Sequence, residues 1–191
     1  MNYEFFTLKL AQLRKPLVEE LTAFCESVDF LAHDSYFKKG RHPGLDSGNI
    51  PLPEVPTSFS EVLETLEPFL PVASLRGFII NTIAPGGHVL EHTDASGSPA
   101  YNGNRINGFH VVHVALRGAD VIYKFRRDKA LPWTERRMDV GGCYLYNNYA
   151  YHETDNLGRD SRINIMLQFA DHEWTQKVKI YQAFNVSWNG Y

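Results

Sequence analysis

The chain has 191 residues, of which 43% are hydrophobic and 21% charged, and its net charge is −3 at pH 7. This composition excludes a disordered chain and a chain with general electrostatic attraction to nucleic acid. The length predicts one domain over residues 1–191, and the aromatic share of 13% favours strands.

The first part of the chain combines a strand with two helices. We expect a strand over 3–10, a helix over 15–26, a Gly- and Pro-rich loop over 33–57 and a short helix over about 59–67. Ser58 and Glu61 have the spacing of a capping box, and Pro68 follows the second helix.

From residue 75 the sequence changes to short runs rich in Val, Ile, Phe and Tyr, separated by Gly, Asn or Asp. The expected strands are the segment 75–84, the extended segment 88–94, GFHVVHVALRG (108–118), VIYKF (121–125), CYLYNN (143–148) and SRINIMLQF (161–169). A polar loop is expected over 95–107. The predicted fold class is mainly β with flanking helices, with six to eight strands packed as a sandwich or jelly roll.

Several features bear on the partners and the compartment. The basic stretch 124–137 is interrupted by Asp, Pro and Glu, which favours a solvated hairpin or loop over a nucleic-acid surface. Cys25 and Cys143 lie too far apart in sequence to suggest a disulfide framework. The segment MNYEFFTLKL lacks the basic start and apolar run of a signal peptide, and no segment has the length of a membrane span. We therefore expect a cytoplasmic protein with neither a nucleic-acid nor a membrane partner.

Residues 88–96, HVLEHTDAS, match two metal-binding patterns. His88, Glu91 and His92 fit H-x-x-E-H, a zinc-peptidase pattern that requires a helix. His92 and Asp94 fit H-x-D, part of a non-haem iron site, which suits an extended segment. The flanking Gly, Pro and Ser residues leave room for only about two helical turns, so the extended interpretation is favoured. In a strand, His88, Leu90, His92 and Asp94 would share one face and Glu91 would lie on the other.

A third metal ligand is expected on a later part of the chain. His152 lies just past an aromatic strand and before a polar turn, and the other candidates are His110, His113 and His172. Ten residues after His152, Arg162 begins the last expected strand. Alternation puts Arg162, Asn164, Met166 and Gln168 on one face. A cation entering an apolar sheet requires an anion, and a dicarboxylate cosubstrate would supply one.

The set His92-x-Asp94, His152 and Arg162 resembles the iron(II)- and 2-oxoglutarate-dependent dioxygenases over roughly residues 75–170. The resemblance implies a double-stranded β-helix, a cupin-like jelly roll. The stretch PGGHVLEHTD is similar to the aspartyl/asparaginyl β-hydroxylase branch, which includes bacterial proline hydroxylases. The vertebrate peptidyl hydroxylases of that branch lack the metal carboxylate and have an arginine at the position of Val111. Asp94 therefore points toward the small-molecule members.

The resemblance also implies the roles of individual residues. His92, Asp94 and His152 would be the catalytic Fe(II) ligands, whereas Arg162, His113 and Asn164 would contact 2-oxoglutarate. O2 would take the remaining position, with ascorbate as a supporting reductant. The implied reaction hydroxylates an unactivated C–H bond of an amino acid, a peptidyl residue or a small metabolite, and releases succinate and CO2. Further candidates for the pocket wall or substrate contact are His88, Tyr144, Tyr146, Asn104 and Arg105.

Several alternatives stay open at this point. One is a zinc metallopeptidase that uses His88, Glu91 and His92, and another is a non-catalytic, cupin-like metal- or ligand-binding module. His113 equally fits an ordinary core histidine. The sequence does not name the substrate. The aromatic tail 171–191 either covers the barrel or joins two subunits of a homodimer.

Overall fold

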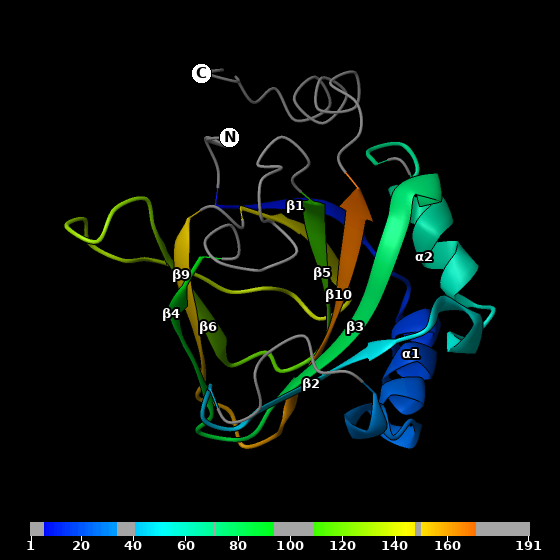
Figure 1. The fold of residues 1–191 in the computed structure, drawn as a ribbon, viewed down its shortest axis with the longest axis horizontal. Helices are drawn as coiled ribbons and strands as arrows, with labels where there is room; N and C mark the ends of the chain where they lie inside the picture. Colours follow the sequence, from blue (N-terminus) through cyan, green and yellow to red (C-terminus); the bar gives the residue numbers. More distant parts are fainter. Residues whose placement is uncertain (1–5, 34–40, 71, 94–108, 148–149, 171–191) are drawn as a thin grey trace.

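Two antiparallel β-sheets face each other and form the body of the protein (Figure 1). The computed structural model describes residues 6–33, 41–70, 72–93, 109–147 and 150–170. Within these ranges, the larger sheet has the strand order β1-β8-β5-β10-β3-β2 and the smaller has the order β4-β9-β6-β7. The larger sheet comprises β1 (Thr7–Gln12), β2 (Leu45–Ile50), β3 (Leu75–Ile83), β5 (Phe109–Arg117), β8 (Gly142–Tyr146) and β10 (Arg162–Ala170). The smaller comprises β4 (His88–His92), β6 (Val121–Arg126), β7 (Thr134–Arg136) and β9 (Tyr151–Asn156).

The chain from β3 to β10 passes back and forth between the two sheets. Strands β3, β5, β8 and β10 belong to the larger sheet, whereas β4, β6, β7 and β9 belong to the smaller. This arrangement is an eight-stranded jelly roll, or double-stranded β-helix. It confirms the predicted fold class. Strands β1 and β2 extend the larger sheet at its two edges.

Two helices, α1 (Lys15–Ser27) and α2 (Phe59–Leu66), cover the outer face of the larger sheet (Figure 1). The core between them is apolar: Ile165 and Leu167 of β10 share one buried cluster with Leu21 of α1 and Val62 of α2. All four side chains are fully buried. Burying an aliphatic side chain of this size contributes about 1.5–3 kcal/mol, so this layer supplies much of the stability. The described residues also include short 3-10 helices at Phe30–Ala32, Leu52–Glu54 and Val72–Ser74.

The inner face of the larger sheet is more polar than the outer face. Along β10, Arg162, Asn164 and Met166 alternate with the outward-facing aliphatic residues and are themselves buried. Met166 packs in a second cluster with Phe125 and Tyr146, which lies between the two sheets. The alternation expected along this strand is therefore observed, and it places an arginine inside the barrel.

The prediction of a loop over 33–57 is wrong in part, because Leu45–Ile50 forms strand β2 at the edge of the larger sheet. Its sequence, LDSGNI, has low strand propensity, and the pairing with β3 overrides it. Gly48 is required there because a Cβ atom at this position would lie 2.0 Å from the carbonyl oxygen of Phe30. The glycine that suggested a loop thus permits close packing beside a strand.

Strands β7 and β9 are also absent from the expected elements. The structure places His152 within β9, whereas the sequence predicted it just past an aromatic strand and before a polar turn. The β9 sequence YHETDN is polar because its outward positions carry Glu153 and Asp155, which pair with Lys124 of β6. The basic stretch 124–137 forms the β6–β7 hairpin, as predicted.

The capping box proposed for the second helix is not formed. Ser58 already has helical backbone angles and makes no side-chain cap hydrogen bond. Glu61 instead receives two hydrogen bonds from the guanidinium of Arg14, at 2.8 and 2.6 Å. The helix nevertheless begins at Phe59, because its apolar face packs on the sheet.

Cys25 and Cys143 are free thiols in the outer core. Burial raises the pKa of each to about 12. Among the described residues, none of the helices is long and apolar enough to cross a bilayer.

Candidate functional site

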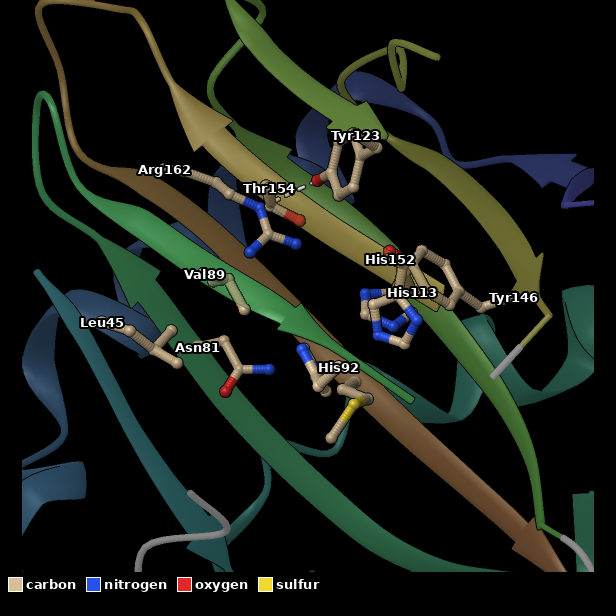
Figure 2. A pocket seen from close by; sticks show the side chains of 11 residues that line it. Leu45, Asn81, Val89, His92, His113, Tyr123, Tyr146, His152, Thr154 and Arg162 are labelled. Atoms are coloured by element: carbon tan, nitrogen blue, oxygen red, sulfur yellow. Dashed lines mark hydrogen bonds between the residues drawn. The ribbon is translucent and has the colours of Figure 1, made fainter. Parts of the chain in front are cut away.

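A pocket that is open in part to solvent lies between the two sheets (Figure 2). Side chains from both sheets line it. The larger sheet contributes Leu45, Asn81, His113, Tyr146, Arg162 and Met166. The smaller sheet contributes Val89, His92, Tyr123, His152 and Thr154. Four of the residues singled out from the sequence, His92, His113, His152 and Arg162, are therefore brought together here.

His92 and His152 face each other across paired strands β4 and β9, with their ring centroids 4.3 Å apart. Each ring donates its Nδ1–H to a backbone carbonyl two residues earlier, at 2.7 Å from Leu90 O and at 2.9 Å from Ala150 O. Because a carbonyl only accepts, Nδ1 carries the proton and the lone pair of the neutral ring is on Nε2. Neutral imidazoles fixed in this way are well suited to bind a transition metal through Nε2.

A β-bulge turns His92 into the pocket. The register pairs Val89 with Thr154 and His92 with His152, so Leu90 and Glu91 together oppose a single residue of β9. As a result Val89 and His92, three positions apart, both line the pocket. Regular alternation would have placed them on opposite faces.

The bulge also separates the residues of the H-x-x-E-H pattern. His88 lies on the outer face of the smaller sheet, where Nδ1 contacts the carboxylate of Asp155. Glu91 is on the same outer face and pairs with Arg126. The expectation that His88 and His92 share a face is therefore wrong. Because β4 is a strand and its two histidines diverge, the zinc-peptidase arrangement is not formed.

The expected third ligand, Asp94, lies outside the described residues, as do Asn104, Arg105 and His172. The side chain of His110 is likewise not described. Among the residues that the structure does describe, no third histidine, cysteine or carboxylate completes a metal-binding group with His92 and His152. The described part of the site thus consists of two imidazoles on adjacent strands.

Arg162 is a buried cation at the start of β10, with 4% of its surface exposed. Its Nε donates to the hydroxyl of Tyr123 at 2.8 Å, and the guanidinium carbon lies 5.1 Å from the centroid of the Tyr123 ring. Figure 2 shows the guanidinium turned toward the pocket. Within the described ranges, no carboxylate lies within ion-pair distance of Arg162. A buried cation without a counter-ion is costly, so the pocket is suited to an anionic ligand.

His113 and Asn164 form a buried pair next to this cation. The Asn164 Nδ2 donates to His113 Nδ1 at 3.1 Å, and the His113 ring stacks on Tyr146 at 4.2 Å. His113 lines the pocket, whereas Asn164 lies behind it. The side-chain oxygens of Asn164 and Asn81 are buried and have no hydrogen-bond partner among the described residues. Such groups are rare in folded proteins, and Asn81 presents its amide to the pocket.

Of the two tyrosines expected in the pocket wall, only Tyr146 lies there. The hydroxyl of Tyr144 bonds instead with Asp139, accepting from its backbone N–H at 2.9 Å. Tyr123 and Thr154 also line the pocket and were not predicted from the sequence. Strand alternation could have found them, since Tyr123 lies two residues before the buried Phe125 and Thr154 lies two residues after His152.

His42 lies beside the histidine pair. Its ring centroid is 5.2 Å from that of His92, and its Nδ1 accepts a hydrogen bond from the backbone N–H of Leu90 at 3.1 Å. Burial, together with the nearby His92, Arg41, His88 and His152, lowers the pKa of His42 to about 4.

Comparison with known proteins identifies the fold. No protein-family model and no curated protein matches the sequence. The non-heme α-ketoglutarate-dependent carbocyclase SnoK from nogalamycin biosynthesis has a TM-score of 0.65 and 14% identity, covering 88% of this chain and 80% of its own. A Pseudomonas putida prolyl-4-hydroxylase has a TM-score of 0.60 and 16% identity, covering 89% of this chain and 95% of its own.

HygX from Streptomyces hygroscopicus, solved with nickel and 2-oxoglutarate bound, has a TM-score of 0.61 and 13% identity, covering 87% of this chain and 83% of its own. The three solved proteins therefore share their fold with this chain over nearly its whole length. At 13–16% identity the likeness is one of fold. One fold can carry many functions, so the function depends on the residues of the pocket.

Proposed function

We propose that the protein is an iron(II)- and 2-oxoglutarate-dependent oxygenase that hydroxylates an unactivated C–H bond. The observation that carries the proposal is the buried guanidinium of Arg162, which shares a pocket with the histidine pair and has no carboxylate partner among the described residues. A dicarboxylate could pair one carboxylate with Arg162 and extend its other end to a metal bound by the histidine pair. The solved proteins with this fold include several named as 2-oxoglutarate- or α-ketoglutarate-dependent.

The residues present fit a metal of the iron(II) type. His92 and His152 would hold it through Nε2, because both Nδ1 atoms are engaged by backbone carbonyls. Asp94 would complete the two-histidine, one-carboxylate set, which leaves positions open for a chelating cosubstrate. Iron(II) at this site, with 2-oxoglutarate and O2, would supply the oxidant for hydroxylation, and the 2-oxoglutarate would be converted to succinate and CO2.

The chain's own contribution is to bind and orient the cosubstrate. Arg162 would pair with the distal carboxylate, for which its planar fork is suited. The Tyr123 hydroxyl accepts from Arg162 Nε and so keeps its own proton to donate to the same carboxylate. His113, held by Asn164, would make a further contact. The buried side chains around Met166 and Phe125 exclude water from this end of the barrel.

The substrate class follows from the resemblance and stays broad. An amino acid, a peptidyl residue or a small metabolite would supply the C–H bond. Asp94 favours the small-molecule members of the aspartyl/asparaginyl hydroxylase-like branch, including proline hydroxylases.

A metal- and cosubstrate-binding experiment tests the proposal. The purified full chain, loaded with Ni(II) to prevent turnover, is titrated calorimetrically with 2-oxoglutarate. In parallel, the Fe(II) protein with ascorbate and O2 is assayed for succinate. We expect saturable binding and slow succinate formation even without substrate. Absence of both would contradict the proposal. Metal binding without 2-oxoglutarate binding would favour a cupin-like binding module.

Variants distinguish the iron site from a peptidase site. His92→Ala and Asp94→Ala should each abolish tight metal binding, because each removes one of three protein ligands. Glu91→Gln is the matched control, since Glu91 faces outward and pairs with Arg126. We expect it to bind metal as the wild type does. Loss of function in Glu91→Gln, together with zinc as the native metal, would instead support the metallopeptidase.

A further inference from the structure

The β4 bulge contains a side-chain contact that the metal site alone does not explain. Leu90 is one of the two bulge residues, and its N–H does not follow the regular ladder. His42 lies in the segment just before β2, and its Nδ1 accepts a hydrogen bond from this N–H at 3.1 Å. The hydrogen bond is partly buried, since His42 is 3% exposed whereas Leu90 is 44% exposed. A backbone N–H shielded from water is costly unless it is bonded. The imidazole of His42 therefore takes the place of a strand partner at the bulge.

The same residue, Leu90, also orients the ring of His92. Its carbonyl oxygen accepts the Nδ1–H of His92 at 2.7 Å. A continuous chain of hydrogen bonds thus runs from His42 through both backbone polar groups of Leu90 to His92. The two imidazoles also lie in contact, with ring centroids 5.2 Å apart and planes tilted by 40°. His42 thereby limits both the position and the rotation of the His92 ring.

We propose that His42 is a positioning residue for the metal ligand His92. The inference rests on the proposed function, because positioning matters only if His92 binds a metal. His42 holds Leu90 in the bulge, and the bulge directs Nε2 of His92 toward His152. Residues that orient metal ligands typically change the metal affinity by about 10–100-fold when they are removed.

His152 is oriented by a different means, which makes the role of His42 specific. The carbonyl that accepts from His152 belongs to Ala150, and the N–H of Ala150 donates to the carbonyl of Asn147 at 3.2 Å, so no side chain takes part. Loss of the His42 side chain should therefore act on one ligand only. The start of β4 is held separately, because His88 N–H donates to the carbonyl of Pro43 at 2.8 Å.

The two contacts require opposite tautomers, which can be measured in the wild-type protein. A backbone N–H only donates, so neutral His42 must carry its proton on Nε2. His92 must carry its proton on Nδ1, because it donates to a carbonyl. Long-range ¹H–¹⁵N NMR of the metal-free full chain at neutral pH reports both protons. A proton on Nδ1 of His42 would overturn the proposal without any variant.

Two substitutions then separate the hydrogen bond from the bulk of the side chain. His42→Leu keeps similar volume but removes the acceptor, whereas His42→Asn returns an acceptor oxygen near the position of Nδ1. The probe is Co(II), followed by its visible absorption, with thermal unfolding measured alongside. We expect His42→Leu to bind Co(II) about 10–100-fold more weakly and with an altered absorption band. His42→Asn should recover most of the affinity and the wild-type band.

His88→Asn is the matched control, because His88 is on the outer face of the same strand. It should bind Co(II) as the wild type does. The inference would be overturned if His42→Leu bound Co(II) as tightly as the wild type. It would also be overturned if His88→Asn lost as much Co(II) affinity as His42→Leu, or if His42→Asn recovered none of it. If His42→Leu does not fold, the Co(II) affinity of His42→Asn and the tautomers measured by NMR in the wild type test the inference. If the wild type itself binds no Co(II), the proposed function fails, and the inference fails with it.

Discussion

The two faces of strand β10 differ sharply although their residues alternate along one strand. On the outer face, Ile163, Ile165 and Leu167 are buried against the helices in a continuous apolar layer. On the inner face, Arg162 and Asn164 are equally buried but polar. A protein built for stability alone would place apolar residues on both faces, because burying a polar group costs free energy unless it is fully paired. Under the proposed function, the inner face sacrifices stability for ligand binding.

The largest expected effect comes from replacing the buried cation. Arg162→Met keeps a long side chain but removes the charge, so 2-oxoglutarate would lose its ion pair. Breaking such a buried pair costs about 2–5 kcal/mol, and we expect calorimetric affinity for 2-oxoglutarate to fall by at least about 30-fold. The free energy of unfolding should stay constant or rise, since a buried charge is replaced by an apolar group. Unchanged affinity would remove Arg162 from the site.

The converse substitution lies on the outer face. Leu167→Ala leaves a cavity in a fully buried layer and should lower the free energy of unfolding by about 2–5 kcal/mol. Urea unfolding measures this change. The affinity of the folded variant for 2-oxoglutarate should match that of the wild type. If Leu167→Ala weakened 2-oxoglutarate binding as strongly as Arg162→Met, the two faces would not be functionally separate.

The two faces of β10 could be predicted from the sequence, because alternation alone separates Arg162 and Asn164 from the aliphatic residues. The same rule failed on β4. One extra residue in the bulge shifts the register, and no residue type in HVLEH marks its position. Only the pairing partner, β9, shows that His88 and His92 point to opposite faces. The contact of His42 with Leu90 was equally hidden, because it joins segments 48 residues apart.

Strands with polar sequences were the other source of error. YHETDN of β9 contains Glu153 and Asp155, whose charges are paired with Lys124 across the sheet. LDSGNI of β2 is held by its pairing with β3. In both segments tertiary contacts override the local propensity, so the sequence alone favours a loop or turn. His152 was nevertheless singled out and lies in the pocket, because its spacing to Arg162 does not depend on which element carries it.

A smaller effect is expected from the hydroxyl that accepts from Arg162. Tyr123→Phe keeps the ring under the guanidinium but removes the partner of Nε. Hydrogen bonds to charged groups contribute about 1.5–3 kcal/mol, so 2-oxoglutarate affinity should fall by roughly 10–100-fold. Metal affinity should not change, because Tyr123 does not contact the histidine pair through any described hydrogen bond. A loss of Co(II) binding in this variant would show that the cosubstrate and metal ends of the pocket are not independent.

The smallest effects test the difference between the outer and inner faces of the larger sheet most directly. The same substitution can be made at adjacent positions on opposite faces of β3. Ile80 belongs to the outer core and Ile79 to the cluster between the sheets, and both are almost fully buried. Ile→Val should cost about 0.5–1.5 kcal/mol of unfolding free energy at either position, because each loses one methylene group. Only Ile79→Val should alter 2-oxoglutarate affinity, since Ile79 is paired with Met166, which lines the pocket. A change of equal size in Ile80→Val would mean that strain passes through the sheet, and the outer layer would then contribute to binding as well as to stability.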